Sequence, residues 1–297
     1  MAVGGAVTGG VIGRYINLDR SEARRATVEA KFERFGLTDR YRRFAAIDGG
    51  ARPPVGGLKP GEVGCFLSHY EVLREHAGDG RHVHVVEDDV VFGPQTAMII
   101  DMVVDQQLAE VDVLYTDVSP NFNQVLFLSM LENLRATGMT DPVQRTVFNG
   151  RPFPLNIAFL DLGGQAFTSS NAYIVSYRSI ERLVAAMAAE IARGPTMPVD
   201  VFYSEQFSSG AFSARCTIPF LTSIAPPHTA PSTIGDAHKT MDLVCCLLRS
   251  HFFIDRDIAA ISALTAGLTE GLTTPDYAEP MVELMRFLFS DRFALAR

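Results

Sequence analysis

The chain has 297 residues, of which 47% are hydrophobic, and a formal net charge of −8. This length can bury a large core, in one α/β domain or in one domain with a helical appendage. The acidic balance argues against nucleic-acid binding, because proteins that bind nucleic-acid phosphates are normally basic.

Nothing in the sequence predicts a membrane span or an oxidised protein. No apolar run approaches the roughly 18 residues of a transmembrane helix, and the N-terminus lacks the basic start of a secretory signal. The cysteines do not have the spacing of a zinc site, and they indicate a reducing compartment: Cys65, Cys216, Cys245 and Cys246. We therefore expect a cytoplasmic protein without a transmembrane segment, with peripheral membrane contact left open.

Strand and helix patterns alternate through the first 120 residues. They predict strands at residues 11–18, 44–47 and 111–115 and amphipathic helices at residues 21–35 and 62–76. This alternation is typical of a parallel sheet with crossover helices, in which ligands bind at the carboxyl ends of the strands. Asn17, Asp48 and Asp117 follow predicted strands, so we expect a ligand site there.

An acidic tripeptide, Glu87-Asp88-Asp89, interrupts the apolar stretch 81–93, which predicts one buried strand. Successive carboxylates repel one another and resist burial unless a positive charge lies among them. A divalent cation such as Mg2+ or Mn2+ would supply it. Strand alternation would point Glu87 and Asp89 to one face, which makes them the metal candidates, and Asp88 to the other. Alternatively, the acids mark a strand end in solvent, with Asp88 capping a turn.

The second half of the chain has weaker patterns. They predict helices at residues 125–135, 177–193, 240–253, 257–268 and 277–295, a strand at 172–176 and an extended segment at 217–224. The Pro- and Gly-punctuated segment 140–161 could be an insertion over the site. We expect a main domain at 1–239, with a donor half at about 10–120 and an acceptor half at about 121–239. A helical extension at 240–297 would pack on the core or form a homodimer.

Several blocks of the chain recur in one known family. They are INLDR at 16–20, AAIDG at 45–49, GEVGCFLSHYEVL at 61–73, VVEDDVVF at 85–92, SSNAYIVS at 169–176 and MPVD at 197–200. Across residues 10–235 the chain resembles glycosyltransferase family 25, the lipopolysaccharide and lipooligosaccharide glycosyltransferases with relatives among the collagen galactosyltransferases. The resemblance implies a GT-A fold, which is a Rossmann-like, mostly parallel sheet flanked by helices. It also implies a nucleotide-sugar donor, usually with Mn2+ (or Mg2+).

The resemblance implies roles for individual side chains. Glu87 and Asp89 would take the register of a D-x-D metal motif. Arg24 would contact the pyrophosphate or base, with a surface helix position as the alternative. His69 matches the family block, with a satisfied core histidine as the alternative. The full set of expected donor-binding residues is Asn17, Leu18, Arg24, Asp48, Ser68, His69 and Asp88.

The resemblance also implies inversion at the anomeric carbon, which requires a general base for the acceptor hydroxyl. Asp200, in the block MPVD, is the expected base, with Asp117 and Glu205 as runners-up. The alternative is that Asp200 only caps a helix. His228 is a candidate late metal ligand, as is His238, because imidazole tolerates Mn2+; each could equally be a surface histidine in a Pro-rich loop.

These features favour a metal-dependent inverting glycosyltransferase that moves a hexose, such as galactose, from a UDP-sugar to a glycan or other hydroxyl-bearing acceptor. One alternative is a catalytically silent scaffold, against which the intact acidic tripeptide, Asp48 and Asp200 argue. The other is a phosphohydrolase or nucleotidyltransferase, for which the chain lacks a Gly-Lys-Ser/Thr loop and an aspartyl nucleophile motif.

Overall fold

The computed structural model describes residues 10–51, 57–120, 123–138, 146–148, 151–153, 156–225, 239–257, 259 and 261. The strands are β1 (Val11–Asn17), β2 (Tyr41–Ala45), β3 (His82–Glu87), β4 (Val90–Phe92), β5 (Val113–Tyr115), β6 (Thr146–Phe148), β7 (Arg151–Phe153), β8 (Ala158–Asp161), β9 (Ala172–Val175), β10 (Ala214–Ile218) and β11 (Thr222–Ile224). The helices are α1 (Glu22–Arg34), α2 (Pro60–Glu75), α3 (Thr96–Glu110), α4 (Gln124–Ala136), α5 (Ile180–Arg193), α6 (Val199–Ser208) and α7 (Lys239–Phe252), with a short 3-10 turn η1 (Gly49–Ala51).

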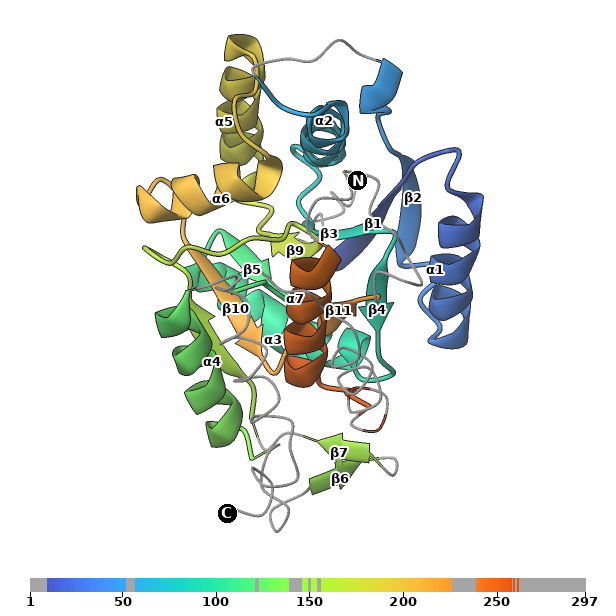
Figure 1. Ribbon diagram of the computed structural model, residues 1–297, viewed down its shortest axis with the longest axis vertical. Helices are drawn as coiled ribbons and strands as arrows, with labels where there is room; N and C mark the ends of the chain where they lie inside the picture. The colour runs from blue at the N-terminus through green and yellow to red at the C-terminus, as the bar shows by residue number, and fades with distance from the viewer. Residues whose placement is uncertain are drawn as a thin grey trace, which may run out of the picture.

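A seven-stranded sheet in the order β2-β1-β3-β9-β5-β10-β8 forms the centre of the molecule (Figure 1). β1 pairs in parallel with β2 and β3, and β5 pairs in parallel with β10. β9 runs antiparallel between β3 and β5, and β8 closes the other edge antiparallel to β10. This mostly parallel sheet flanked by helices confirms the expected Rossmann-like α/β architecture of the GT-A type.

The central strands are buried because their sequences are almost continuously apolar. Every residue of β5 and β9 is buried, as is β3 up to its last residue. α2 covers β1 and β3 and packs in turn against α5 and α6 (Figure 1). The N-terminal half of α2 is thereby fixed above the carboxyl ends of β1 and β3. No helix in the described part of the chain is long and apolar enough to cross a membrane.

Two predicted strands differ from the structure. β2 covers Tyr41–Ala45 rather than residues 44–47, since it pairs in register with β1 from Gly13↔Tyr41 to Asn17↔Ala45. The stretch 81–93 is not one strand: β3 ends at Glu87, a turn follows at Asp88 and Asp89, and β4 pairs with β11 in a separate sheet. The prediction that strand alternation orients the three acids is therefore wrong.

The helix α7 packs on the core rather than standing apart from it. Phe252 is fully buried, and its backbone oxygen accepts a hydrogen bond from Phe220. The predicted helices beyond residue 257 lie almost entirely outside the described residues, as does most of the predicted insertion at 140–161. The domain boundary at residue 239 and the homodimer contact therefore stay predictions.

Two glycines allow the loop after β2 to lie directly on α2. A Cβ atom on Gly64 would come within 2.5 Å of the Ile47 carbonyl oxygen, and one on Gly49 within 1.6 Å of the Pro60 carbonyl oxygen. Both obstacles are backbone atoms, which cannot turn away as a flexible side chain could. Gly64 and Gly49 thus serve, in part, to bring two backbones together.

We expect Gly64→Ala to lower the free energy of unfolding by about 1–3 kcal/mol, because the added methyl group forces the loop and helix apart. Urea unfolding followed by circular dichroism measures this change. Met102→Ala, at a position with 68% exposure on α3, is the control and should stay within about 0.5 kcal/mol. A Gly64→Ala protein as stable as this control would show that the contact relaxes without cost.

Candidate functional site

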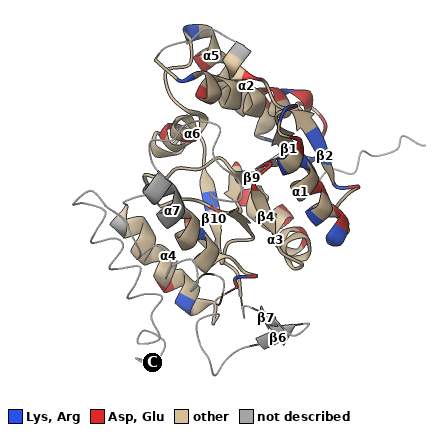
Figure 2. Cartoon of the chain, turned by 45° about the vertical axis from the view of Figure 1, so that its right-hand side comes forward, with Lys and Arg blue, Asp and Glu red and all other residues tan. Residues whose placement is uncertain are grey.

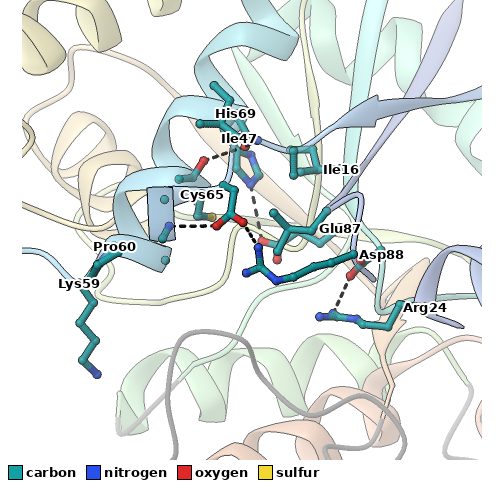
Figure 3. Close-up of a pocket in the computed structure, with 18 residues that line it drawn as sticks. Ile16, Arg24, Ile47, Lys59, Pro60, Cys65, His69, Glu87 and Asp88 are labelled. Carbon is teal, nitrogen blue, oxygen red and sulfur yellow. Dashed lines mark hydrogen bonds and ion pairs between the residues drawn. The ribbon is translucent and has the colours of Figure 1, made fainter. Parts of the chain in front are cut away.

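A cavity of about 410 Å³ opens where the carboxyl ends of β1, β2 and β3 meet the N-terminal half of α2 (Figure 3). This is the edge at which the sequence predicted a ligand site. With the exception of Asn17, the predicted donor-binding residues all line it: Leu18, Arg24, Asp48, Ser68, His69 and Asp88. Of the acidic tripeptide, Glu87 and Asp88 line the cavity.

The positive charge among the acids comes from Arg24. Its Nη2 atom lies 2.6 Å from Oδ1 of Asp88 and 2.8 Å from Oδ2 of Asp89. Asn17 donates from Nδ2 to the other oxygen of Asp88 at 2.6 Å. Arg24 is only 18% exposed, so the alternative of a free surface helix residue is wrong. The two aspartates are held in a turn by protein partners, and neither lies in open solvent.

Glu87 has a different set of neighbours. Its Oε1 atom lies 3.6 Å from Nε2 of His69 and accepts a hydrogen bond from Ser170 at 3.2 Å. Burial raises the pKa of Glu87, but His69, the charge of Arg24 and the hydrogen bond from Ser170 together hold the pKa below its ordinary value. Glu87 is therefore ionised at neutral pH in the cavity wall.

Asp89 is the least satisfied of the three acids. Its Oδ1 atom is buried without a hydrogen-bond partner. Burial, followed by the charge of Glu87, raises the pKa of Asp89 to about 7, against the opposing effect of Arg24. Arg24 thus balances only part of the negative charge of the tripeptide, and a bound cation would balance more of it.

We expect the stability difference between Asp89→Asn and the wild type to depend on pH in metal-free protein. The folded state holds the Asp89 proton up to about pH 7, whereas the unfolded carboxyl titrates near 3.8. Asp89 therefore destabilises the fold increasingly as pH rises between these values. Urea unfolding with a chelator should show the free energy of unfolding of Asp89→Asn rising relative to that of the wild type between about pH 4 and about pH 7. A difference that stays constant with pH would contradict the raised pKa.

The loop of residues 169–171 joins Glu87 to Asp200. Ser170 donates to Glu87, and the Ser169 amide donates to Oδ2 of Asp200 at 3.2 Å. Ser169 has a φ of 89°, a conformation that non-glycine residues rarely adopt and that clusters at functional sites. The Asn171 carbonyl accepts from the Glu87 amide at 2.8 Å. This loop belongs to the block SSNAYIVS at 169–176. The sequence alone predicted no role for its individual residues.

Asp200 lies behind the cavity wall, in the first turn of α6. It does not line the cavity, but its charge is one cause of the raised pKa of Cys65, after burial and the charge of Glu87. Pro198 takes the N-cap position of α6. Oδ1 of Asp200 accepts from the Val201 amide at 2.9 Å, so Asp200 satisfies a backbone donor in the first turn of this helix without being its N-cap residue. Of the runners-up, Asp117 is fully buried in an ion pair with Arg249, and Glu205 is exposed. His228 and His238 lie outside the described residues.

The remaining predicted residues shape the cavity or its rim. Ser68 accepts from the Ile47 amide at 2.8 Å and donates to the Gly64 carbonyl at 2.7 Å, which ties the loop after β2 to α2. Asp48 pairs with Arg20 at the cavity edge. Figure 2 shows acidic and basic residues together on α1, beside this region.

Sequence reasoning missed Cys65. Among the described residues, the structure brings together one group of three metal-ligating atoms: Sγ of Cys65, a ring nitrogen of His69 and a carboxylate oxygen of Glu87, all within 4.8 Å of one another. The available signal was the four-residue separation of Cys65 and His69 on a predicted helix, which places both side chains on one face. Asp89 does not belong to this group.

Comparison with known proteins matches the segment that carries the α2, β3 and α6 parts of this site. Residues 56–203 match the family model described as glycosyltransferase family 25 (LPS biosynthesis protein). A "Glycosyltransferase 25 family member" of Drosophila pseudoobscura pseudoobscura is 33% identical over 122 residues, which cover 34% of this chain. The chain spans only 19% of the length of that relative. The acidic tripeptide, the loop at 169–171 and Asp200 all lie inside the matched segment, and the chain therefore carries a glycosyltransferase family 25 domain.

Proposed function

We propose that this chain is a metal-dependent inverting glycosyltransferase that moves a hexose from a nucleotide-sugar to a hydroxyl group of a glycan or other acceptor. The observation that carries the proposal is the position of the acidic tripeptide. Its first two residues, Glu87 and Asp88, line a cavity at the carboxyl ends of three parallel strands, and the tripeptide lies within a glycosyltransferase family 25 domain. A UDP-hexose, with UDP-galactose as the first candidate, is the proposed donor.

The cavity suits a nucleoside diphosphate. Arg20, Arg24 and Lys59 bring positive charge to its walls, and the N-terminus of α2 faces it with the positive end of the helix dipole. Leu18 offers apolar surface to a base, and Asp48 offers carboxylate oxygens to ribose hydroxyls. Arg24 also neutralises part of the acidic turn, so the donor does not meet three uncompensated carboxylates.

Glu87 and Asp89 are the proposed ligands of a hard divalent ion, Mn2+ or Mg2+. Carboxylate oxygens are the donors such ions prefer. The buried, unpartnered Oδ1 of Asp89 and the raised pKa of this residue indicate a missing positive charge. When bound, the ion would act as a Lewis acid that stabilises the departing nucleotide diphosphate. His228, the proposed third ligand, lies outside the described residues.

Asp200 is the proposed general base. The acceptor oxygen attacks the anomeric carbon, its proton passes to the Asp200 carboxylate, and the bond from that carbon to the diphosphate oxygen breaks with inversion. The Ser169 amide orients the Asp200 carboxylate. The description of the matched family makes a lipopolysaccharide-type glycan the first acceptor class to test. The described cysteines are free, which suits the reducing cytoplasmic location that we also propose.

A transfer assay tests this function. The chain is incubated with a panel of UDP-hexoses, Mn2+ and glycan acceptors, and mass spectrometry detects acceptors that gain one hexose. We expect one donor to react, a chelator to stop the reaction, and NMR to show the inverted anomer. If no donor binds or reacts under any metal, the silent-scaffold alternative replaces the proposal.

A further inference from the structure

Three chemically different ligand atoms meet at one corner of the cavity. Sγ of Cys65, a ring nitrogen of His69 and a carboxylate oxygen of Glu87 lie within 4.8 Å of one another. Cys65 and His69 are one helical turn apart on α2, and Glu87 ends β3. Figure 3 shows Cys65 and His69 on the α2 side of the cavity, with an interaction joining His69 to Glu87. This group shares Glu87 with the carboxylate pair proposed for Mn2+ and differs from that pair by its thiol and imidazole.

Hydrogen bonds behind His69 fix which of its ring nitrogens is available. Tyr203 donates to the sulfur of Met187, which can only accept. The Tyr203 and Tyr173 hydroxyl oxygens lie 2.9 Å apart, and the Tyr173 hydroxyl lies 2.7 Å from Nδ1 of His69. Nδ1 is thus occupied by this hydrogen bond, and Nε2 is the ring nitrogen left for a metal, which histidine ligates in its neutral form.

The free nitrogen is aimed into the group. His69 is fully buried, and its Nε2 atom has no hydrogen-bond partner. It lies 3.6 Å from Oε1 of Glu87, which is longer than a hydrogen bond. A buried polar atom without a hydrogen-bond partner is costly. A cation bound between them satisfies both atoms.

We propose that Cys65, His69 and Glu87 bind a thiophilic divalent metal ion such as Zn2+, with a fourth coordination position open to the cavity. Sulfur, nitrogen and carboxylate donors are the ligands of zinc, and a site with three protein ligands keeps a position for water or a substrate oxygen. Ser170 and Tyr173 hold Glu87 and His69 from behind, as outer-shell partners do in metal sites. Binding displaces the Cys65 thiol proton to solvent, so the thiolate is the ligand.

Cobalt titration of the full chain tests this site. The protein is first treated with a chelator, then titrated with Co2+ without oxygen. We expect one equivalent to produce a thiolate-to-cobalt charge-transfer band, which added Zn2+ removes. Cys65→Ser should abolish the band, and Tyr173→Phe should weaken Co2+ binding about 10- to 100-fold. Cys216→Ser, at a buried free cysteine on β10, should leave the band unchanged.

The variant Asp89→Asn separates this test from the test of the proposed function. It should keep the cobalt band while losing Mn2+-dependent donor binding. Absence of the band in folded wild-type protein, or its persistence in Cys65→Ser, overturns the proposal. If Cys65→Ser fails to fold, X-ray absorption at the zinc edge of the wild type replaces it. A shell with one sulfur among nitrogen and oxygen ligands supports the site, and a shell without sulfur rejects it.

Discussion

Replacing Arg249 with alanine should lower the free energy of unfolding by about 3–5 kcal/mol. Arg249 is 4% exposed on α7, and both its Nε and Nη2 atoms donate to Oδ2 of Asp117, which is fully buried. Burial raises the pKa of Asp117 and Arg249 opposes this rise. Loss of the guanidinium leaves a buried carboxylate that must stay charged without a partner or take up a proton, and both outcomes destabilise the fold.

Urea unfolding at neutral pH measures this loss. Arg74→Ala is the matched control, because Arg74 is 56% exposed in its ion pair with Glu71, and exposed pairs contribute little. The double variant Arg249→Met with Asp117→Leu should recover most of the loss, since apolar residues of similar volume can replace a buried pair. A loss below about 1 kcal/mol for Arg249→Ala would show that α7 is not anchored through this pair.

Asp200→Asn should reduce sugar transfer by about 10²- to 10⁴-fold while leaving donor affinity unchanged. An amide cannot take the acceptor proton, and its one oxygen can replace only one of the two carboxylate oxygens that accept from the Ser169 and Val201 amides. Urea unfolding therefore accompanies the rates, to show that the variant is folded. Initial rates at saturating donor measure sugar transfer, and donor titration measures donor affinity.

Glu205→Gln is the control for Asp200→Asn, since Glu205 is an exposed carboxylate on the same helix, α6. Glu205→Gln should change neither the rate of sugar transfer nor the donor affinity. Transfer retained in Asp200→Asn would place the base elsewhere. A loss of donor binding in Asp200→Asn would instead make Asp200 part of the donor site.

Local patterns predicted the first half of the fold well. The strand at 11–18 and the helices at 21–35 and 62–76 were confirmed as β1, α1 and α2. Their signals are short-range: β-branched runs, helical spacing of apolar residues, and glycine at Gly36 after a helix. The cavity edge followed from the same patterns, because the topology of a parallel sheet brings strand ends together.

The features that the sequence did not predict depend on contacts between distant residues. The turn at Asp88 and Asp89 is held by Asn17 and Arg24, and strand alternation could not anticipate it. Arg249 reaches Asp117 across 132 residues of sequence, which no spacing rule links. α3 was not predicted because its apolar residues are spread around the helix rather than confined to one face.

Binding of nucleotide-sugars to wild type and Asp89→Ala, with and without Mn2+, tests the central claim most directly. Calorimetry on a panel of UDP-hexoses reports affinity, and slow hydrolysis reports turnover without an acceptor. We expect one donor to bind the wild type only with Mn2+, and Asp89→Ala to abolish that binding. If no nucleotide-sugar binds under any metal, or if Asp89→Ala binds as tightly as the wild type, the acidic turn is not a metal-dependent donor site.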